Sequence, residues 1–310
     1  MRGSVKVQVS FLLRLIEEIG NSKKKAKESA RIDGAKTWHD IGKRIGIYSY
    51  ATRNTYKDVW MQFLNFCREE YGVKDPVKLD AIHFKAYLEK KIADGIKYST
   101  FQKHAAALEK LQVAINVFLS TYRPDIKKSM DYSKDIAEVR KKAQKLLKRF
   151  EGVRHYQDPQ KVLNFLDGNY RLVAELQLRG GLRFSEAQKL KPFSFKGNGV
   201  IEIKGKGGKI RTVKIPLELY EIVKKRVDDG IWYIKKETYL NHLKNACKLA
   251  NEEYMGSHGL RWNYALNSFF EKTSLGVGYF EALQSVSHEM GHNRPDITEH
   301  YLFGVKKKRS

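Results

Sequence analysis

Apolar residues recur every three or four positions through most of the first half of the chain, which is the spacing of one face of an α-helix. The clearest of these segments begins at Ser49 and ends at Gly72, residue types that commonly cap the two ends of a helix. A shorter apolar stripe predicts a helix from Ser10, as N-cap, to about Ile19. The pattern predicts helices at about 10–19, 49–72, 80–93, 99–123 and 135–150.

The third of the four long helices carries its own start and stop signals. Ser99 and Gln102 have the spacing of a capping box, and Pro124 follows the last apolar position. Four long helices within about a hundred residues predict an independent helical domain over residues 48–152. Residues 1–47 then form an N-terminal helical extension.

The second half of the chain combines helical spacing with a strict alternation of apolar and polar residues. Segments 200–203 and 210–215 alternate with period two on either side of a glycine-rich turn, so they predict a β-hairpin with Lys206 at its tip. We expect residues 153–310 to form an α+β domain, and the whole fold to be mainly α with a small β component. Helices are predicted after Asp158-Pro159, before Gly180-Gly181, and at about 216–228, 238–254, 258–272 and 279–290.

The charge balance indicates a polyanionic partner. The chain has 59 Lys and Arg residues against 35 Asp and Glu residues, a formal net charge of +24, and both halves are basic. The run of lysines at 23–27 is compatible with a solvated helix face or with contacts to a DNA backbone.

The cysteine count and the lengths of the apolar runs argue against a disulfide-rich protein and against a membrane-spanning protein. Cys67 and Cys247 lie far apart without a CxxC partner, so we expect both to be buried as small apolar side chains. No apolar run approaches the roughly 18 residues of a membrane span, so we expect a cytoplasmic protein, associated with the nucleoid when bound to DNA.

Four separated pieces of the second half carry unusual local chemistry. The first two are Gly181-Leu-Arg-Phe-Ser-Glu186 and the glycine-flanked Lys206. The third is His258-Gly-Leu-Arg261, where His258 and Arg261 share one face of a helix. The fourth is Gly291-His292, followed nine residues later by Tyr301.

In this order, the four pieces resemble the boxes of the tyrosine recombinase family, which includes phage-type integrases and Xer-like site-specific recombinases. The resemblance spans about residues 48–305. It covers the family's GLRxSE, GKGxKxR, HxLR and LGH boxes and the terminal tyrosine, with Met290 in place of the usual leucine and Trp262 in place of a common histidine. The family implies a four-helix, SAM-like core-binding domain followed by an α+β catalytic domain.

The resemblance also implies the role of each residue in the cleavage of a DNA phosphodiester. Tyr301 is the nucleophile, His258 its base, and Lys206 the acid that protonates the leaving 5′ oxygen. Two arginines clamp the phosphate and a histidine donates to it, while a glutamate supports the first arginine. The remaining implied site residues are Arg183, Arg261, His292 and Glu186.

By the same resemblance, the product is a 3′-phosphotyrosyl link, and strands are exchanged through a Holliday junction by a homotetramer on paired double-stranded DNA sites. An accessory DNA-bending factor is a further expected partner, and no cofactor or metal is required. In relatives a C-terminal segment docks on a neighbouring protomer. With nine residues after Tyr301, we expect this exchange to be reduced or replaced.

Three alternatives remain open at this stage. A type IB topoisomerase or a telomere resolvase has the same chemistry, and a DNA-binding regulator has the same fold without catalysis. Residues 288–292 also match HExxH, the helix signature of zinc metalloproteases, although Gly291 and Pro295 predict that the helix ends near the second histidine.

Overall fold

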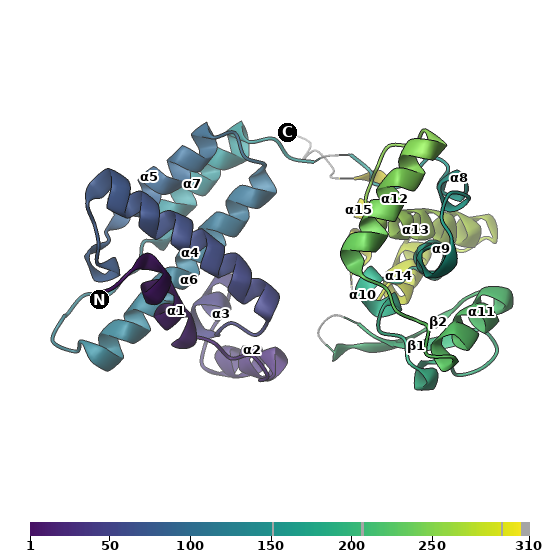
Figure 1. Cartoon of the computed structure of the whole chain (residues 1–310), viewed down its shortest axis with the longest axis horizontal. Coiled ribbons are helices and arrows are strands. Elements are labelled where there is room, and N and C mark those ends of the chain that lie inside the picture. The colour runs from purple at the N-terminus through teal and green to yellow at the C-terminus, as the bar shows by residue number, and fades with distance from the viewer. Residues whose placement is uncertain (151, 206–207, 293, 305–310) are drawn as a thin grey trace. The chain divides into compact units, whose positions relative to one another are not determined.

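The computed structural model describes residues 1–150, 152–205, 208–292 and 294–304. The chain divides into two compact units, Met1–Arg149 and Phe150–Ser310. Both units are mainly helical (Figure 1). The domain limits drawn from the sequence, at 47 and 152, stay a prediction about which segments fold independently.

The first unit consists entirely of helices and their connections. Trp60 and Phe63 on α4 lie at its centre, where the Trp60 indole Nε1 donates to the Ala107 carbonyl at 2.7 Å. The ring of Phe63 packs against Phe84 at 4.8 Å between centroids. The helices are α1 (Val5–Arg14), α2 (Lys23–Ile32), α3 (Trp38–Arg44), α4 (Tyr50–Tyr71), η1 (Pro76–Lys78), α5 (Ala81–Ala93), α6 (Tyr98–Tyr122) and α7 (Ser133–Leu146).

The N-terminal helix differs from the prediction. It begins at Val5 with Ser4 as its N-cap and ends at Arg14, so the expected cap at Ser10 is wrong. The reason is that Val5 and Val9 are buried in the same core as Leu12, which extends the buried stripe towards the N-terminus. Two further helices, α2 and α3, follow in a region where the apolar spacing indicated none.

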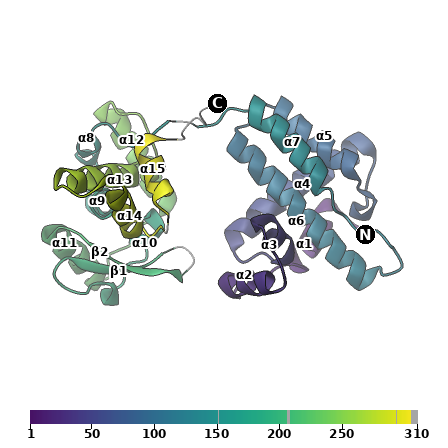
Figure 2. The same ribbon diagram turned by 180° about the vertical axis from the view of Figure 1, so that it is seen from behind.

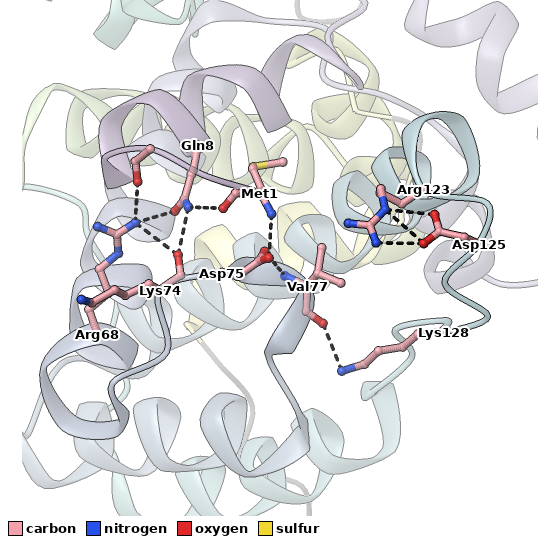
Figure 3. A network of polar contacts seen from close by, with 10 residues as sticks. Met1, Gln8, Arg68, Lys74, Asp75, Val77, Arg123, Asp125 and Lys128 are labelled. Carbon is pink, nitrogen blue, oxygen red and sulfur yellow. Dashed lines mark hydrogen bonds and ion pairs between the residues drawn. The ribbon is translucent and has the colours of Figure 1, made fainter.

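Polar contacts also hold the N-terminal segment against the rest of the first unit (Figure 3). The Met1 amino group lies 2.7 Å from the Asp75 carboxylate. The Gln8 amide donates to the Lys74 carbonyl at 2.9 Å, and Arg68 donates to the Gly3 carbonyl and to the Gln8 side-chain oxygen, both at 2.9 Å. Helix α1 is therefore held by the same unit as α4.

The capping box predicted at Ser99 and Gln102 does not form. Helix α6 begins at Tyr98 with Lys97 at the N-cap position, two residues before the predicted cap, and the Tyr98 backbone N–H donates to the Lys148 carbonyl at 3.1 Å. A carbonyl from the far end of the unit thus satisfies the Tyr98 N–H, which precedes the predicted cap, and the helix starts ahead of Ser99. The ends predicted for α4 are confirmed, since Ser49 caps its N-terminus and Gly72 adopts the left-handed conformation at its C-terminus.

The second unit packs helices around α9 and carries an antiparallel hairpin, so the expected mainly α fold with a small β component is confirmed. The hairpin pairs Val200 with Lys214 and Lys204 with Ile210. The hairpin and α11 lie at one end of the unit, and α8 and α12 at the other (Figures 1 and 2). The elements are α8 (Pro159–Leu163), α9 (Gly168–Gly180), α10 (Phe184–Ala187), η2 (Pro192–Ser194), β1 (Val200–Lys204), β2 (Ile210–Lys214), α11 (Leu217–Asp228), α12 (Lys236–Ala250), α13 (Ser257–Ser274), α14 (Tyr279–Glu289) and α15 (Pro295–Phe303).

Two further predictions concern the cysteines and membrane-spanning helices. Cys67 and Cys247 are both buried and unpaired, as predicted. In the described parts of the chain, no helix has the length and apolar character needed to cross a lipid bilayer.

Candidate active site

The turn that carries the first arginine depends on a glycine. Helix α9 ends at Gly180, and its C-cap Gly181 has a φ of +62°, the left-handed conformation that glycine adopts at little cost. A Cβ atom at this position would lie 2.5 Å from the ring of Tyr264. The tight turn places Arg183 at the N-cap position of the short helix α10, with Glu186 buried one turn later.

Glu186 lies at the centre of a buried charge network. Its carboxylate accepts from the Arg183 side chain at 2.7 Å and from the Arg183 backbone N–H at 2.8 Å. Arg211 on β2 donates to both carboxylate oxygens, at 3.1 and 3.0 Å. Burial raises the pKa of Glu186, but the hydrogen bonds from Arg211 and Arg183 outweigh it, so the pKa falls to about 2. Glu186 is therefore a carboxylate at any pH at which the protein works.

Arg261 is completely buried, and its guanidinium holds the site together. One Nη donates to the carbonyl of Gly181 and the other to that of Met290, so the arginine joins the turn after α9 to the end of α14. The Glu186 carboxylate lies 4.0 Å away, and Arg261 Nε has no hydrogen-bond partner among the described residues. Burial, followed by the charge of Arg183, lowers the pKa of Arg261 to about 10, so it is still a cation at neutral pH.

Tyr301 on α15 is buried, and its hydroxyl lies 2.8 Å from Nε2 of His258 on α13. Burial lowers the pKa of His258 to about 4, and the charges of Arg261 and Arg183 act in the same direction. The residue as a whole is exposed to solvent, which weakens the effect of burial and screens the neighbouring charges. A neutral imidazole with its proton on Nδ1 accepts a hydrogen bond from the phenol through Nε2.

His292 is oriented by Arg183. Its Nε2 lies 3.0 Å from an Nη of Arg183, and a guanidinium can only donate, so Nε2 accepts and the ring proton lies on Nδ1. That Nδ1 is buried without a hydrogen-bond partner in the described part of the chain. Burial, followed by the charges of Arg261 and Arg183, lowers the pKa of His292 to about 3, so the ring is neutral. His292 thus has one N–H donor to offer to a ligand.

The predicted site residues that the structure describes are brought together. Contacts run from Glu186 through Arg183 to His292, and the ring of His292 lies 5.7 Å from that of Tyr301. Lys206 lies outside the described residues. The strands that flank it are described up to Lys204 and from Ile210.

A cavity of about 170 Å³ opens beside this network. Arg183 and Arg211 line it together with Lys209, and two glycines complete its wall, Gly205 and Gly291. Three cationic side chains around so small a volume give it the electrostatic character of an anion site. At Gly291, a Cβ atom would lie 3.1 Å from an Nη of Arg211, so the glycine lets the arginine approach the backbone.

Two residues of the site were not assigned from the sequence. Arg211 donates to both oxygens of Glu186 and, through Nε, to the Glu289 carbonyl at 2.9 Å, so it joins the hairpin to α10 and to α14. Its place in GKGxKxR, two residues before the inward-facing Val213, was the available signal. Trp262 packs its ring 4.8 Å from that of Tyr301, and its place directly after Arg261, where the family often has a histidine, was the available signal.

The HExxH match does not form a metal centre. Helix α14 ends at Glu289, and His292 turns to Arg183 while His288 contacts Gln284 on its own helix. The Glu289 carboxylate accepts from Tyr264 at 3.1 Å and Ser268 at 3.0 Å, and pairs with Lys272 at 2.8 Å. Within the residues that the structure describes, no group of three or more His, Cys, Asp or Glu side chains is placed to hold a metal ion.

Comparison with known proteins indicates the same family as the motifs that carry the site residues. Residues 145–304, just over half of the chain, match the model of the phage integrase family, so this chain belongs to that family. The resemblance to tyrosine recombinases is thereby confirmed. A search of curated protein sequences finds no match.

Solved structures show the same fold over the whole chain. A XerH site-specific recombinase bound to difH substrate, in a pre-cleavage complex, has 17% sequence identity and a TM-score of 0.63, with 100% of this chain and 95% of that chain covered. A lambda integrase dimer bound to a COC′ core site has 12% identity and a TM-score of 0.59, with 100% and 85% covered. At such sequence identities the structural similarity establishes the fold alone, and the activity has to be inferred from the site residues.

Proposed function

We propose that this protein is a site-specific DNA recombinase that cleaves and rejoins duplex DNA through a covalent link to Tyr301. One observation supports this proposal above the others. The Tyr301 hydroxyl lies 2.8 Å from the neutral ring of His258, within a cluster that also contains Arg183, Arg261 and His292. A phenol, a base and fixed cations in one site are what transesterification at a phosphodiester requires.

In the cleavage step, the Tyr301 oxygen forms a bond to the scissile phosphorus while its proton passes to Nε2 of His258. The bond from phosphorus to the 5′ oxygen of the next nucleotide breaks, and that oxygen takes a proton from Lys206. The products are a 3′-phosphotyrosyl link and a free 5′-hydroxyl. Rejoining is the reverse attack by a 5′-hydroxyl, so the ester energy is conserved and no nucleotide cofactor is consumed.

Negative charge grows on the non-bridging phosphoryl oxygens as the bonds exchange. Arg183 is 24% exposed, so its guanidinium can meet the phosphate, and the Nδ1–H of His292 is a second donor. Arg261 contributes mainly through its charge, because its two Nη groups already bind carbonyls. Glu186 and Arg211 hold Arg183 in place, which saves the cost of ordering it during the reaction.

Strand exchange between two sites, through a Holliday junction and a homotetramer, is part of the same proposal. One solved neighbour in support is a lambda integrase tetramer bound to a Holliday junction, with 15% identity, a TM-score of 0.50, and 98% of this chain and 87% of that chain covered. A type IB topoisomerase or a telomere resolvase would share the cleavage step without this exchange.

The test is covalent capture on nicked duplex DNA taken from the sequence that flanks the gene. We expect an adduct that survives denaturation and EDTA and that is absent in Tyr301→Phe. A DNA-binding regulator would form no adduct, which would overturn the proposal. A two-site assay then decides between recombination and simple relaxation, since only a recombinase joins strands from two different duplexes.

A further inference from the structure

Residues 22–45, which contain α2 and α3, form a small basic lobe on the first unit, referred to below as the α2–α3 lobe. It has eight Lys and Arg residues against three Asp and Glu residues. Of the ten residues of α2, Ala30 alone is buried. The lobe's own apolar core is the small cluster of Ala30, Ala35 and Ile41, with Ile45 packed against it. Its surface is therefore dominated by charge.

The charges of α2 do little for the stability of the helix. Lys23 and Lys27, and Lys27 and Arg31, are spaced four residues apart on one helix face, where like charges repel. Lys24, 81% exposed, has Glu28 as an opposite charge at 3.9 Å, the outer limit of an ion pair. A helix that collects like charges on an exposed face is better explained by an external anion than by the folding of the lobe.

An exposed tryptophan organises two of these cations. Trp38, the first residue of α3, is 69% exposed. The Lys27 ammonium and the Arg31 guanidinium each lie 5.1 Å from the centroid of its ring. A cation–π contact is favourable at this distance, so the indole holds the two cations next to each other against their repulsion.

The lobe is also held firmly on the helical core. Thr37 and Asp40 form a capping box at the start of α3, and at its other end the Lys110 ammonium donates to the carbonyls of Gly42 and Ile45. Burial, followed by the charge of Lys23, lowers the pKa of Lys110 to about 8. These contacts fix α3 on α6, and α2 is the outer layer.

We propose that the α2–α3 lobe is a second DNA-binding surface, which contacts the phosphate backbone of duplex DNA independently of the base sequence. Lys24, Lys27 and Arg31 are its phosphate contacts, and Trp38 is the positioning residue that holds Lys27 and Arg31 together. This inference rests on the proposed function, because it assigns duplex DNA as the partner. It concerns a surface far along the chain from the residues of the active site.

The test measures the affinity of the full chain for a duplex, by fluorescence anisotropy, between about 50 and 200 mM salt. Each phosphate contact contributes about −0.9 to the slope of log K against log salt, so Lys27→Ala/Arg31→Ala should reduce the slope by about 1.8. Over this range the unsubstituted chain then loses about ten-fold more affinity than the variant. The salt slope of Trp38→Ala should lie between that of the unsubstituted chain and that of the double variant. Trp38→Phe should restore the original slope because it keeps an aromatic face.

The matched control is Lys224→Ala/Lys225→Ala on α11. It removes the same charge from exposed positions where each lysine already pairs with an aspartate, Asp228 or Asp229. We expect no change of slope in this control. An equal loss of slope in both double variants would overturn the proposal, because net charge alone would then explain the effect. Circular dichroism melts verify that each variant is folded.

All binding measurements use the Tyr301→Phe background, so that they do not depend on covalent chemistry. If the wild-type chain forms no adduct while the lobe variants still change the salt slope, the proposed function fails and the DNA-binding lobe stands. If adducts form and the slopes are equal, the lobe proposal alone fails. Lobe-dependent binding to vesicles of anionic phospholipid, with DNA binding unchanged, would likewise overturn it in favour of a membrane partner.

Discussion

The two units differ in where their proposed functional charges lie. In Met1–Arg149 the cationic side chains lie mostly on the surface, as on the α2–α3 lobe, and the buried Lys110 serves as a donor to backbone carbonyls. In Phe150–Ser310, Glu186 and Arg261 are buried together at the centre of the site. A charge in water costs little and is screened by salt, whereas a charge in the interior costs more and acts with a stronger field.

This difference separates affinity from chemistry. Exposed cations can attract a polyanion, and salt weakens them uniformly. A buried cation must be satisfied by hydrogen bonds before any substrate arrives, as Arg261 is by two carbonyls, and the partly exposed Arg183 is held in the same way by Glu186. The site is thereby organised in advance, and substitutions in the two units should have effects of different kinds.

The largest effect should come from Arg183→Ala. Removal of a fixed cation from the developing phosphoryl charge should slow covalent cleavage by about 10²–10³-fold, measured as single-turnover adduct formation. The melting temperature and DNA affinity should change little, because this side chain is partly exposed. Arg179→Ala is the matched control, since Arg179 is an exposed arginine on α9 that pairs with Glu175 and Glu218. A large affinity loss with intact cleavage would contradict the separation.

Arg261→Ala should act first on folding. The substitution leaves two buried carbonyls and the Glu186 carboxylate short of their partner, and loss of one member of a buried charged group costs about 3–5 kcal/mol. Thermal unfolding followed by circular dichroism should show a clear fall in melting temperature, with a smaller fall for Arg261→Lys, which keeps the charge. An unchanged melting temperature in the alanine variant would mean that Arg261 is only catalytic.

The smallest of these effects is a pH dependence of stability in the second unit. The folded pKa values of His292 and His258, about 3 and about 4, lie below the ordinary value of 6.5. Between 6.5 and the folded values the unfolded chain binds protons that the folded chain does not, so the free energy of unfolding decreases as pH falls from 6.5 towards 4. Because His258 is exposed to solvent on one side, the slope should be well under the maximum of about 1.4 kcal/mol per pH unit for each histidine.

Denaturant titrations at several pH values measure this slope. His292→Asn should reduce it, because the variant has no titrating group at that position. Below pH 4.5 the protonation of Glu186, whose folded pKa is about 2, adds a further loss of stability. A free energy of unfolding that is constant from pH 7 to pH 4 would contradict the lowered pKa values of the two histidines.

Much of the secondary structure could be predicted from local patterns, and the exceptions have a common cause. Ser49 and Gly72 were correct limits of α4 because each acts on its own backbone neighbours. Ser99 was a wrong limit because a distant carbonyl, that of Lys148, binds the Tyr98 N–H. Helix α2 escaped prediction because it is polar on nearly every side and has almost no apolar stripe to detect.

The sequence alone determined the class of protein, and it predicted the kind of partner and the reactive groups. These follow from residue types at short spacings, which local chemistry dictates. Only the tertiary structure decided what each group binds: Arg261 holds two carbonyls, Arg211 completes the Glu186 network, and His292 is left with one donor. Such pairings join elements far apart in the chain, and burial and hydrogen-bond satisfaction select them only once the whole unit has packed.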